Sequence, residues 1–154
     1  MSGACEPVLI VGLGLMGASL AGALQAISPR PRDDSGEEAS AASAAGYDHY
    51  DDAHGPQVLL HSRRAGAMQH LALLGWGEEA PDLAAAARQA ELAVICAPVG
   101  GIATIAEELL AANPQLLITD VGSTKAELLH ELAAPAAAGR FIGAHPMCGS
   151  HLQG

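Results

Sequence analysis

Short apolar runs alternate along the chain with longer stretches that favour helix. The runs are rich in Val, Ile and Leu, which is typical of strands buried on both faces of a sheet; they lie at Val8–Val11, Gln57–His61, Leu92–Ala97, Leu116–Thr119 and Phe141–Ala144. The stretches between them predict helices at Leu15–Ile27, Ala65–Leu74, Asp82–Gln89, Ile102–Ala112 and Thr124 to about Ala134. Strands that alternate with helices imply right-handed crossovers, so we predict an α/β domain with a doubly wound, mainly parallel sheet.

Two of the predicted helices begin with capping signals. Asp82 precedes an alanine-rich segment, and aspartate is favoured at the N-cap because its side chain accepts a hydrogen bond from the first turn. Thr124 and Glu127 have the spacing of a capping box. We therefore expect one helix to start just after Asp82 and another at Thr124.

The segment Ser28–Pro56 interrupts the alternation. Ser, Ala, Gly, Asp and Glu dominate it, and seven of the seventeen acidic residues of the chain fall within it. A charged segment of this kind buries too little apolar surface to offset the entropy cost of ordering. We interpret it as a mobile insertion between the first helix and the second strand; a surface helix through Glu37–Ala45 is the alternative, because alanine favours helix.

Composition limits the class of protein. A chain of 154 residues has room for one domain with its own core, and a formal net charge of −10 disfavours nucleic-acid binding. The uncharged run Val8–Ile27 is long enough for a membrane span, but four glycines interrupt it and Glu6 stands where a signal peptide requires positive charge. Three cysteines without paired spacing favour free thiols in a reducing compartment. We expect a cytoplasmic protein that binds neither nucleic acid nor membrane.

A glycine-rich turn follows the first predicted strand and opens the first predicted helix. Gly12, Gly14 and Gly17 have the spacing of a dinucleotide-binding fingerprint, in which the glycines permit a tight turn, close approach of the pyrophosphate and close packing of helix on strand. The helix N-terminus, with Leu15 and Met16 in its first turn, adds backbone N–H groups and the positive end of its dipole. We expect this Rossmann-type turn to bind NAD or NADP; a glycine turn that serves packing alone is the alternative.

The end of the second strand is expected to distinguish NADP from NAD. Sites that prefer NAD usually carry an acidic residue there, which binds the ribose 2′-hydroxyl. This chain has His61, Ser62, Arg63 and Arg64 in that place, without a carboxylate. The serine and the two arginines can bind a 2′-phosphate through charge-assisted hydrogen bonds, which favours NADP. Arginines that are merely solvated are the alternative.

Polar residues at the ends of the last two predicted strands are candidates for catalysis. Open α/β sheets bind ligands at the carboxyl ends of their strands; Asp120 and Ser123 follow one strand there, and His145 follows the next. Histidine suits a general base near neutral pH. Ser123 is placed to orient that imidazole or to bind a substrate hydroxyl, and a helix cap is its simpler role. His145, Cys148 and His151 lack a fourth ligand nearby, so we expect no metal site.

Four motifs of the chain resemble those of one enzyme family. They are GLGLMGASL at Gly12–Leu20, APV at Ala97–Val99, TDVGSTK at Thr119–Lys125 and GAHPMCG at Gly143–Gly149. In this order they are similar to the nucleotide-binding domain of prephenate and arogenate dehydrogenases. The resemblance covers the chain apart from Ser28–Pro56, and the last two motifs are its most specific part.

The resemblance implies an oxidative decarboxylation in tyrosine biosynthesis. His145 would accept the proton of the ring hydroxyl as hydride leaves the same carbon for the nicotinamide, and loss of the ring carboxylate as CO2 would aromatise the product. Ser123 would bind the same hydroxyl or hold His145 in place. The expected cofactor-binding residues are Gly12, Gly14, Leu15, Met16, Gly17, Ser62, Arg63, Arg64, Ala97, Pro98, Val99 and Asp120.

The chain departs from the family pattern in two ways. Members that use prephenate often carry an acidic residue shortly after the HPMxG motif, and Ser150–Gly154 contains none, so the choice between prephenate and arogenate stays open. The family's helical second domain, which supplies a substrate-binding arginine and most of the homodimer interface, is absent from the 154 residues. Unless a separate chain supplies that domain, we therefore expect a chain that binds the dinucleotide but turns over slowly or not at all.

Two other functions remain open from the sequence. A dehydrogenase of the β-hydroxyacid or imine-reductase type would share the glycine turn, but such enzymes place their catalytic lysine in a later helical domain. A nucleotide-binding module without catalysis would bind NADP(H) and turn over neither arogenate nor prephenate.

Overall fold

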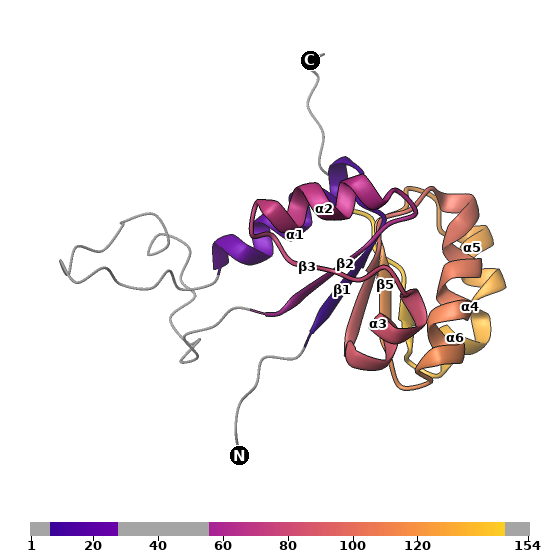
Figure 1. Cartoon of the computed structure of the whole chain (residues 1–154). Helices are drawn as coiled ribbons and strands as arrows, with labels where there is room; N and C mark the ends of the chain where they lie inside the picture. Colours follow the sequence, from indigo (N-terminus) through magenta and orange to yellow (C-terminus); the bar gives the residue numbers. More distant parts are fainter. Residues whose placement is uncertain (1–6, 28–55, 147–154) are drawn as a thin grey trace, which may run out of the picture.

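A computed structural model describes residues 7–27 and 56–146 of the chain (Figure 1). Its elements in chain order are β1 Val8–Val11, α1 Leu15–Ile27, β2 Val58–His61, α2 Ala65–Leu73, β3 Glu78–Glu79, α3 Leu83–Gln89, β4 Leu92–Ile95, the 3-10 helix η2 Val99–Gly101, α4 Ile102–Ala112, β5 Leu117–Asp120, α5 Ala126–Glu131, α6 Ala133–Ala137 and β6 Phe141–Ile142. The predicted insertion, except for its last residue Pro56, lies outside the described residues, as do Cys5, Cys148 and His151.

A six-stranded parallel sheet forms the centre of the molecule. The strand order is β3-β2-β1-β4-β5-β6, and every neighbouring pair is parallel. The order reverses between β1 and β4, which makes the crevice at the carboxyl ends of these two strands the expected ligand site. The predicted fold class, a doubly wound Rossmann-type sheet, is confirmed.

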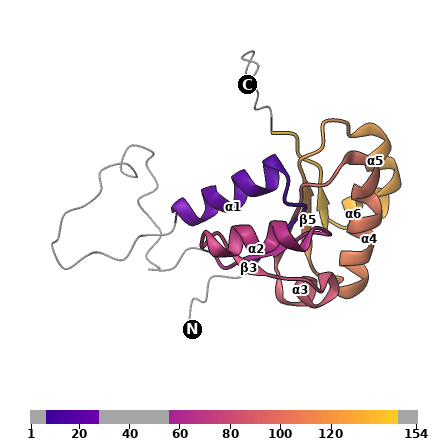
Figure 2. The same cartoon turned by 45° about the horizontal axis from the view of Figure 1, so that its top comes forward.

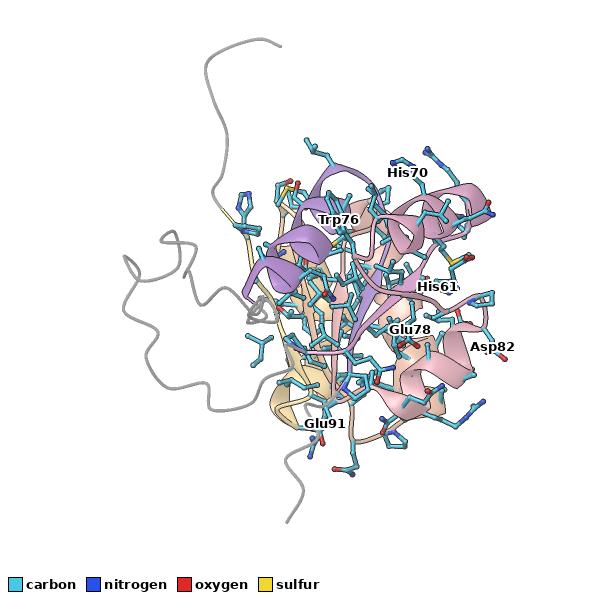
Figure 3. All side chains as sticks on the ribbon, turned by 60° about the vertical axis from the view of Figure 1, so that its left-hand side comes forward. His61, His70, Trp76, Glu78, Asp82 and Glu91 are labelled. Carbon is cyan, nitrogen blue, oxygen red and sulfur yellow. The ribbon has the colours of Figure 1, made fainter. Side chains whose placement is uncertain are left out.

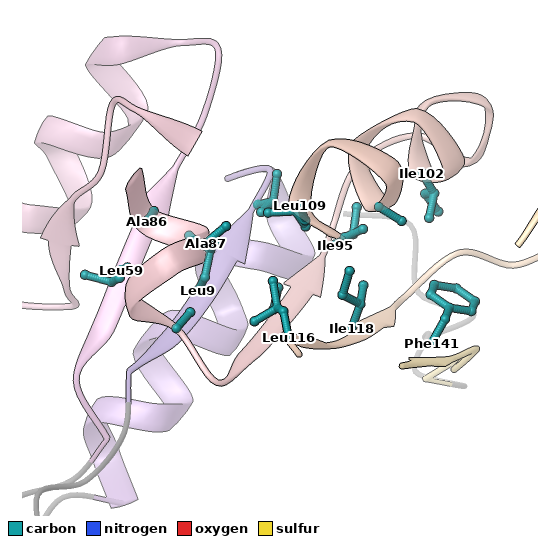
Figure 4. Packing of buried hydrophobic residues seen from close by; sticks show 14 of the residues in the cluster. Leu9, Leu59, Ala86, Ala87, Ile95, Ile102, Leu109, Leu116, Ile118 and Phe141 are labelled. Carbon is teal, nitrogen blue, oxygen red and sulfur yellow. The ribbon is translucent and has the colours of Figure 1, made fainter. Parts of the chain in front are cut away.

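Helices cover both faces of this sheet (Figures 1 and 2). Neighbouring residues of β1 point to opposite faces: Ile10 packs with residues of α1 and α2, whereas Leu9 joins the layer under α3, α4 and α5. Figure 4 shows this second layer, where Leu109 of α4 lies above Leu116 and Ile95. Because the central strands β1, β2 and β4 are covered on both sides, their apolar residues need not alternate with polar ones, as their sequences indicate.

The uncharged run Val8–Ile27 divides into a strand, a glycine turn and a helix of 13 residues. Trp76 lies beside that helix (Figure 3), and a Cβ at Gly22 would lie 3.3 Å from its ring. In the described parts of the chain, no helix is both long enough and apolar enough to cross a membrane. The run therefore forms one strand–turn–helix unit of the sheet.

Several strand boundaries differ from the predicted ones. β4 ends at Ile95 rather than Ala97, β5 is shifted by one residue to Leu117–Asp120, and β6 contains two residues instead of four. β3 and η2 were not predicted, because two exposed glutamates and a Val-Gly-Gly turn carry no hydrophobic period.

The capping signals give one confirmed and one wrong prediction. The carboxylate of Asp82 accepts a hydrogen bond of 2.9 Å from the backbone N–H of Ala85, so this N-cap is confirmed. The capping box at Thr124 and Glu127 is wrong, because the helix starts at Ala126 with Lys125 as its N-cap and without a side-chain cap bond. Instead, a hydrogen bond from Lys125 to the buried carboxylate of Asp120 holds the turn before α5.

The predicted helix to Ala134 is two helices in the structure. α5 ends at Glu131, and α6 starts at Ala133 after Leu132, which has φ −98 and ψ 27. Pro135 explains the break: it has no N–H to donate to residue 131, and its ring would clash with that carbonyl in a continuous helix. In the first turn of α6 the missing N–H costs nothing, since those groups have no intrahelical partner.

Candidate functional site

The register of the sheet places the ends of four strands in one row. Val11 pairs with His61 on one side and with Ile95 on the other, and Ile95 pairs with Asp120. The turns that follow β1, β2, β4 and β5 therefore begin at the same edge of the sheet. These turns carry most of the residues expected from the sequence to bind the cofactor.

Two of the three fingerprint glycines are required by packing. Gly12 has φ +97, and a Cβ there would lie 2.7 Å from the carbonyl oxygen of Cys96. A Cβ at Gly17 would collide with the carbonyl oxygen of Gly12 and would lie 3.3 Å from the Cβ of Cys96. Helix α1 is therefore packed directly onto its own turn and onto the end of β4.

Gly14 differs from these two glycines because the space around it is open. A Cβ at Gly14 would meet no atom within 4 Å, so packing within the described chain does not require glycine here. The turn leads into α1, whose N-terminus offers backbone N–H groups and the positive end of the helix dipole. Leu15 is 84% exposed beside this opening, and Met16 follows it. An anionic group such as a pyrophosphate fits this open turn.

The turn after β2 presents two arginines to solvent. Arg63 and Arg64 are exposed at the start of α2, and the hydroxyl of Ser62 accepts a hydrogen bond of 3.1 Å from the backbone N–H of Arg64. His61 is held on the sheet, with its Nδ1 2.7 Å from the carbonyl oxygen of Ala80. That carbonyl can only accept, so Nδ1 carries the hydrogen. The turn is thus preformed, with its cationic side chains free to reach a ligand.

The turn after β4 packs against the turn after β5. Ala97 and Val99 are half-buried and Pro98 is exposed. A Cβ at Gly122 would lie 3.1 Å from a methyl group of Val99 and 3.0 Å from Ile102, so glycine allows the two turns to approach. This contact joins the expected cofactor turn to the turn that carries Ser123.

The carboxylate of Asp120 is fully buried at the end of β5. Its Oδ2 accepts hydrogen bonds from the backbone N–H of Gly122, at 2.8 Å, and from the Nζ of Lys125, while its Oδ1 accepts one of 3.2 Å from the backbone N–H of Ala144. The ammonium group of Lys125 also donates to the carbonyl oxygen of Gly122. We refer to these bonds, from Gly122, Lys125 and Ala144 to Asp120, as the Asp120 bridge. Among the residues in the described ranges, Asp120 is the one polar or charged residue that is buried.

The two residues expected to act in catalysis lie next to the Asp120 bridge. Ser123 is exposed and directly follows Gly122, and His145 is exposed and directly follows Ala144. The bridge therefore connects the turn that carries the serine to the segment that carries the histidine. The catalytic roles of Ser123 and His145, and the cofactor contact of Asp120, stay predictions, although the burial of Asp120 gives its carboxylate a role inside the protein.

Cys96 lies between the glycine turn and Asp120. Burial raises the pKa of its thiol, and the negative charge of Asp120 raises it further, to about 11. Ionisation of a thiol is disfavoured by both low polarity and a nearby anion. At neutral pH this thiol is therefore protonated, and it packs as a small apolar group behind Gly17.

We predict that Cys96 reacts slowly with thiol reagents. At pH 8 a thiol of pKa about 11 has about a hundredfold less thiolate than one of ordinary pKa, and the thiolate is the nucleophile. The rate of alkylation by iodoacetamide, measured in a variant in which Cys5 and Cys148 are replaced by serine, tests this. Denatured protein gives the reference rate. A folded chain that reacts as fast as the denatured one would contradict the placement of Cys96.

In the ranges that the structure describes, no group of three or more His, Cys, Asp or Glu side chains is arranged to hold a metal ion. The candidate set His145, Cys148 and His151 extends beyond those ranges.

Sequence reasoning did not assign roles to Thr119 and Lys125. The hydroxyl of Thr119 donates a 2.7 Å hydrogen bond to the carbonyl oxygen of Ile142, and Lys125 neutralises Asp120. One signal was available: Thr119 and Asp120 end a strand whose other residues are apolar, and a buried polar side chain requires partners. The partners themselves depend on the register of β6, which the sequence does not contain.

Comparisons with known proteins agree with one another. Residues 52–154 match the family model described as "Prephenate dehydrogenase, nucleotide-binding domain". A prephenate dehydrogenase of Bacillus subtilis is 31% identical over 97% of this chain, and one of Lactococcus lactis is 28% identical over 97%. The chain spans about a third of the length of these curated relatives, 34% and 36% respectively.

Solved structures show the same likeness. The arogenate dehydrogenase of Synechocystis has a TM-score of 0.66 at 25% identity, with 96% of this chain and 43% of that chain covered. The prephenate dehydrogenase of A. aeolicus, in complex with hydroxyphenyl propionate and NAD+, has a TM-score of 0.68 at 23% identity, over 99% of this chain and 45% of that one. An imine reductase from Myxococcus stipitatus, at 13% identity and a TM-score of 0.65, covers 93% of this chain and 41% of its own; at such identity the likeness shows the fold alone.

Proposed function

Because the chain belongs to the family of prephenate dehydrogenase nucleotide-binding domains, we propose that it forms the cofactor-binding half of a dehydrogenase that oxidatively decarboxylates prephenate or arogenate. One observation carries the proposal. The Asp120 bridge ties the Ser123 turn to the His145 segment, at the edge of the sheet where the glycine turn opens. A phosphate-binding turn and a candidate base therefore lie along one edge, as hydride transfer to a nicotinamide requires.

The glycine turn and the start of α1 fit a dinucleotide. The open space around Gly14 admits the pyrophosphate, and Gly12 and Gly17 keep the backbone close enough for α1 to direct its N–H groups there. A bound NAD or NADP supplies the hydride acceptor. The turn formed by Ala97, Pro98 and Val99 packs against the turn that carries Ser123, and it would hold the dinucleotide on that side.

His145 is the proposed proton acceptor. Its imidazole is exposed at the strand end, where a substrate can reach it, and it accepts the proton of the ring hydroxyl as hydride leaves the same carbon. The bond to the ring carboxylate then breaks and CO2 leaves. The electron pair of that bond moves through the ring to the oxygen, which takes the proton back from His145 as the ring becomes aromatic. Ser123, across the Asp120 bridge, donates a hydrogen bond to the same hydroxyl or to His145.

The turn after β2 supports a preference for NADP. Arg63 and Arg64 are exposed at the N-terminus of α2, and no carboxylate in this turn competes for the ribose hydroxyls. Arginine forks match the geometry of phosphate oxygens. The hydroxyl of Ser62 retains its hydrogen for a phosphate oxygen while it accepts from Arg64.

Titration with NADPH and NADH tests the cofactor half of the proposal. We expect tighter binding of NADPH, measured by nicotinamide fluorescence. Arg63→Ala is expected to weaken NADPH binding about tenfold or more, since a charge-assisted hydrogen bond contributes about 1.5–3 kcal/mol, and to leave NADH nearly unchanged. Arg88→Ala on α3 is the control, because it removes one exposed positive charge elsewhere. Equal affinity for the two cofactors would contradict the role of Ser62 and Arg63.

A further inference from the structure

Strand β6 ends before His145. Strand β6 has only two residues, and its ladder to β5 consists of Ile118 with Phe141 and Thr119 with Ile142. His145 lies three residues beyond the last pair. Strand pairing alone therefore does not fix the position of the proposed base.

Side chains at the end of β5 continue the attachment where the ladder ends. The hydroxyl of Thr119 donates to the carbonyl oxygen of Ile142, at 2.7 Å, and the Oδ1 of Asp120 accepts from the backbone N–H of Ala144, at 3.2 Å. Thr119 and Asp120 thus bind the two residues that flank Gly143. The residue after this second attachment is His145.

The attachment requires a carboxylate at position 120, because only hydrogen-bond donors face this buried side chain. Gly122, Lys125 and Ala144 all present donors to the carboxylate, so both oxygens are needed as acceptors. Lys125 compensates the charge, and a Cβ at Gly143 would lie 3.2 Å from the Lys125 side chain, so the lysine packs under the same segment. A carboxylate in this position cannot be replaced by an amide without placing a donor against a donor.

We propose that Thr119 and Asp120 are positioning residues for His145. Their hydrogen bonds fix the segment 142–145 beyond the end of β6. The carboxylate of Asp120 also fixes the Ser123 turn, because it accepts a hydrogen bond from Gly122. This inference rests on the proposed role of His145 as base. It assigns to Asp120 a positioning role inside the protein, whereas the sequence predicted a contact with the cofactor.

The test compares three variants of the isotope-labelled chain by NMR. Asp120→Asn inverts one hydrogen bond of the bridge, and Thr119→Val removes the hydroxyl while it keeps the shape of a half-buried side chain, so this second variant is expected to fold even if the first does not. Asn113→Ala is the matched control: its side chain makes three hydrogen bonds at the opposite end of β5, to Ala87, Ala90 and Gln115.

Two readouts separate positioning from general destabilisation. Amide hydrogen exchange at residues 142–145 is expected to rise about tenfold or more in Asp120→Asn and in Thr119→Val, and to be unchanged in Asn113→Ala after correction for stability. With NADP+ bound, the nuclear Overhauser contacts between the His145 ring and the nicotinamide are expected to weaken in the first two variants. The NADP+ affinity of Thr119→Val, whose residue is not among the expected cofactor-binding residues, is expected to change less than about twofold.

The inference would be overturned if Asp120→Asn and Thr119→Val behaved like Asn113→Ala, with lower stability and an unchanged 142–145 segment. Failure of the wild-type chain to bind NADP+ would instead contradict the proposed function. In that case the exchange rates at residues 142–145 still decide whether the Asp120 bridge holds the segment.

Discussion

Gly17→Ala is expected to destabilise the folded chain severely. The added methyl group would collide with the carbonyl oxygen of Gly12 and press on the Cβ of Cys96, and neither atom is the far end of a flexible side chain that could move aside. Overpacking against rigid backbone costs about 3 kcal/mol or more, a large part of the stability of a domain of this size. Urea unfolding followed by circular dichroism measures the loss.

Gly14→Ala is the matched variant for this prediction. It adds the same methyl group three residues earlier, where no atom lies within 4 Å, so the free energy of unfolding is expected to change by less than about 0.5 kcal/mol. The methyl group would instead occupy the approach of the pyrophosphate, and NADPH affinity is expected to fall about tenfold or more. Similar stability of the two variants would contradict the packing of α1 on its own turn.

His145→Asn is expected to reduce turnover between about a hundredfold and about ten-thousandfold, because a positioned general base contributes a factor of this size. Asparagine keeps polarity and approximate size but cannot accept the proton. NADPH affinity is expected to stay within about twofold, since the residue lies beyond the ladder of β6, and β4 and β5 separate β6 from β1, which the glycine turn follows. The rate is measured from the absorbance of the reduced cofactor, in a form of the protein that turns over prephenate or arogenate.

His70→Asn is the control for this substitution. His70 is an exposed histidine on α2 (Figure 3), so the same chemical change there is expected to leave turnover unchanged. A His145→Asn protein with the wild-type rate would exclude the histidine as proton acceptor and would favour a dehydrogenase whose catalytic residue lies elsewhere.

The fold could be predicted from the sequence wherever one physical signal dominated. Buried parallel strands are continuous apolar runs, so β1 and its helix α1 were predicted with their observed boundaries. α4, whose helix ends before Asn113-Pro114, was predicted equally well. β3 was missed because its two glutamates are exposed at the sheet edge, where backbone pairing with β2 alone forms the strand.

Part of the candidate site could also be predicted from the sequence. Local motifs located the glycine turn and the ends of the strands, and the carboxyl ends of parallel strands all lie on the same side of a sheet. Hydrogen bonds to buried groups could not be predicted: the capping box at Thr124 was expected from local spacing, but Lys125 bonds to the buried Asp120 and the helix starts later. Likewise, nothing in the sequence near Asp120 indicates that its second oxygen binds Ala144, 24 residues away.

Both edges of the sheet are formed by strands of only two residues, β3 and β6. Short edge strands offer few unpaired backbone groups to another chain, and charge on such an edge opposes association further. The β3 edge carries Glu78 and Glu79, both exposed, whereas the β6 edge carries Ile142, which is 57% exposed. In the described part of the chain, strand-to-strand aggregation is therefore opposed by charge and short length at the β3 edge, but by short length at the β6 edge. The β6 edge should be the more adhesive one at low salt, and added salt, which screens the two glutamates, should reduce the difference between the edges.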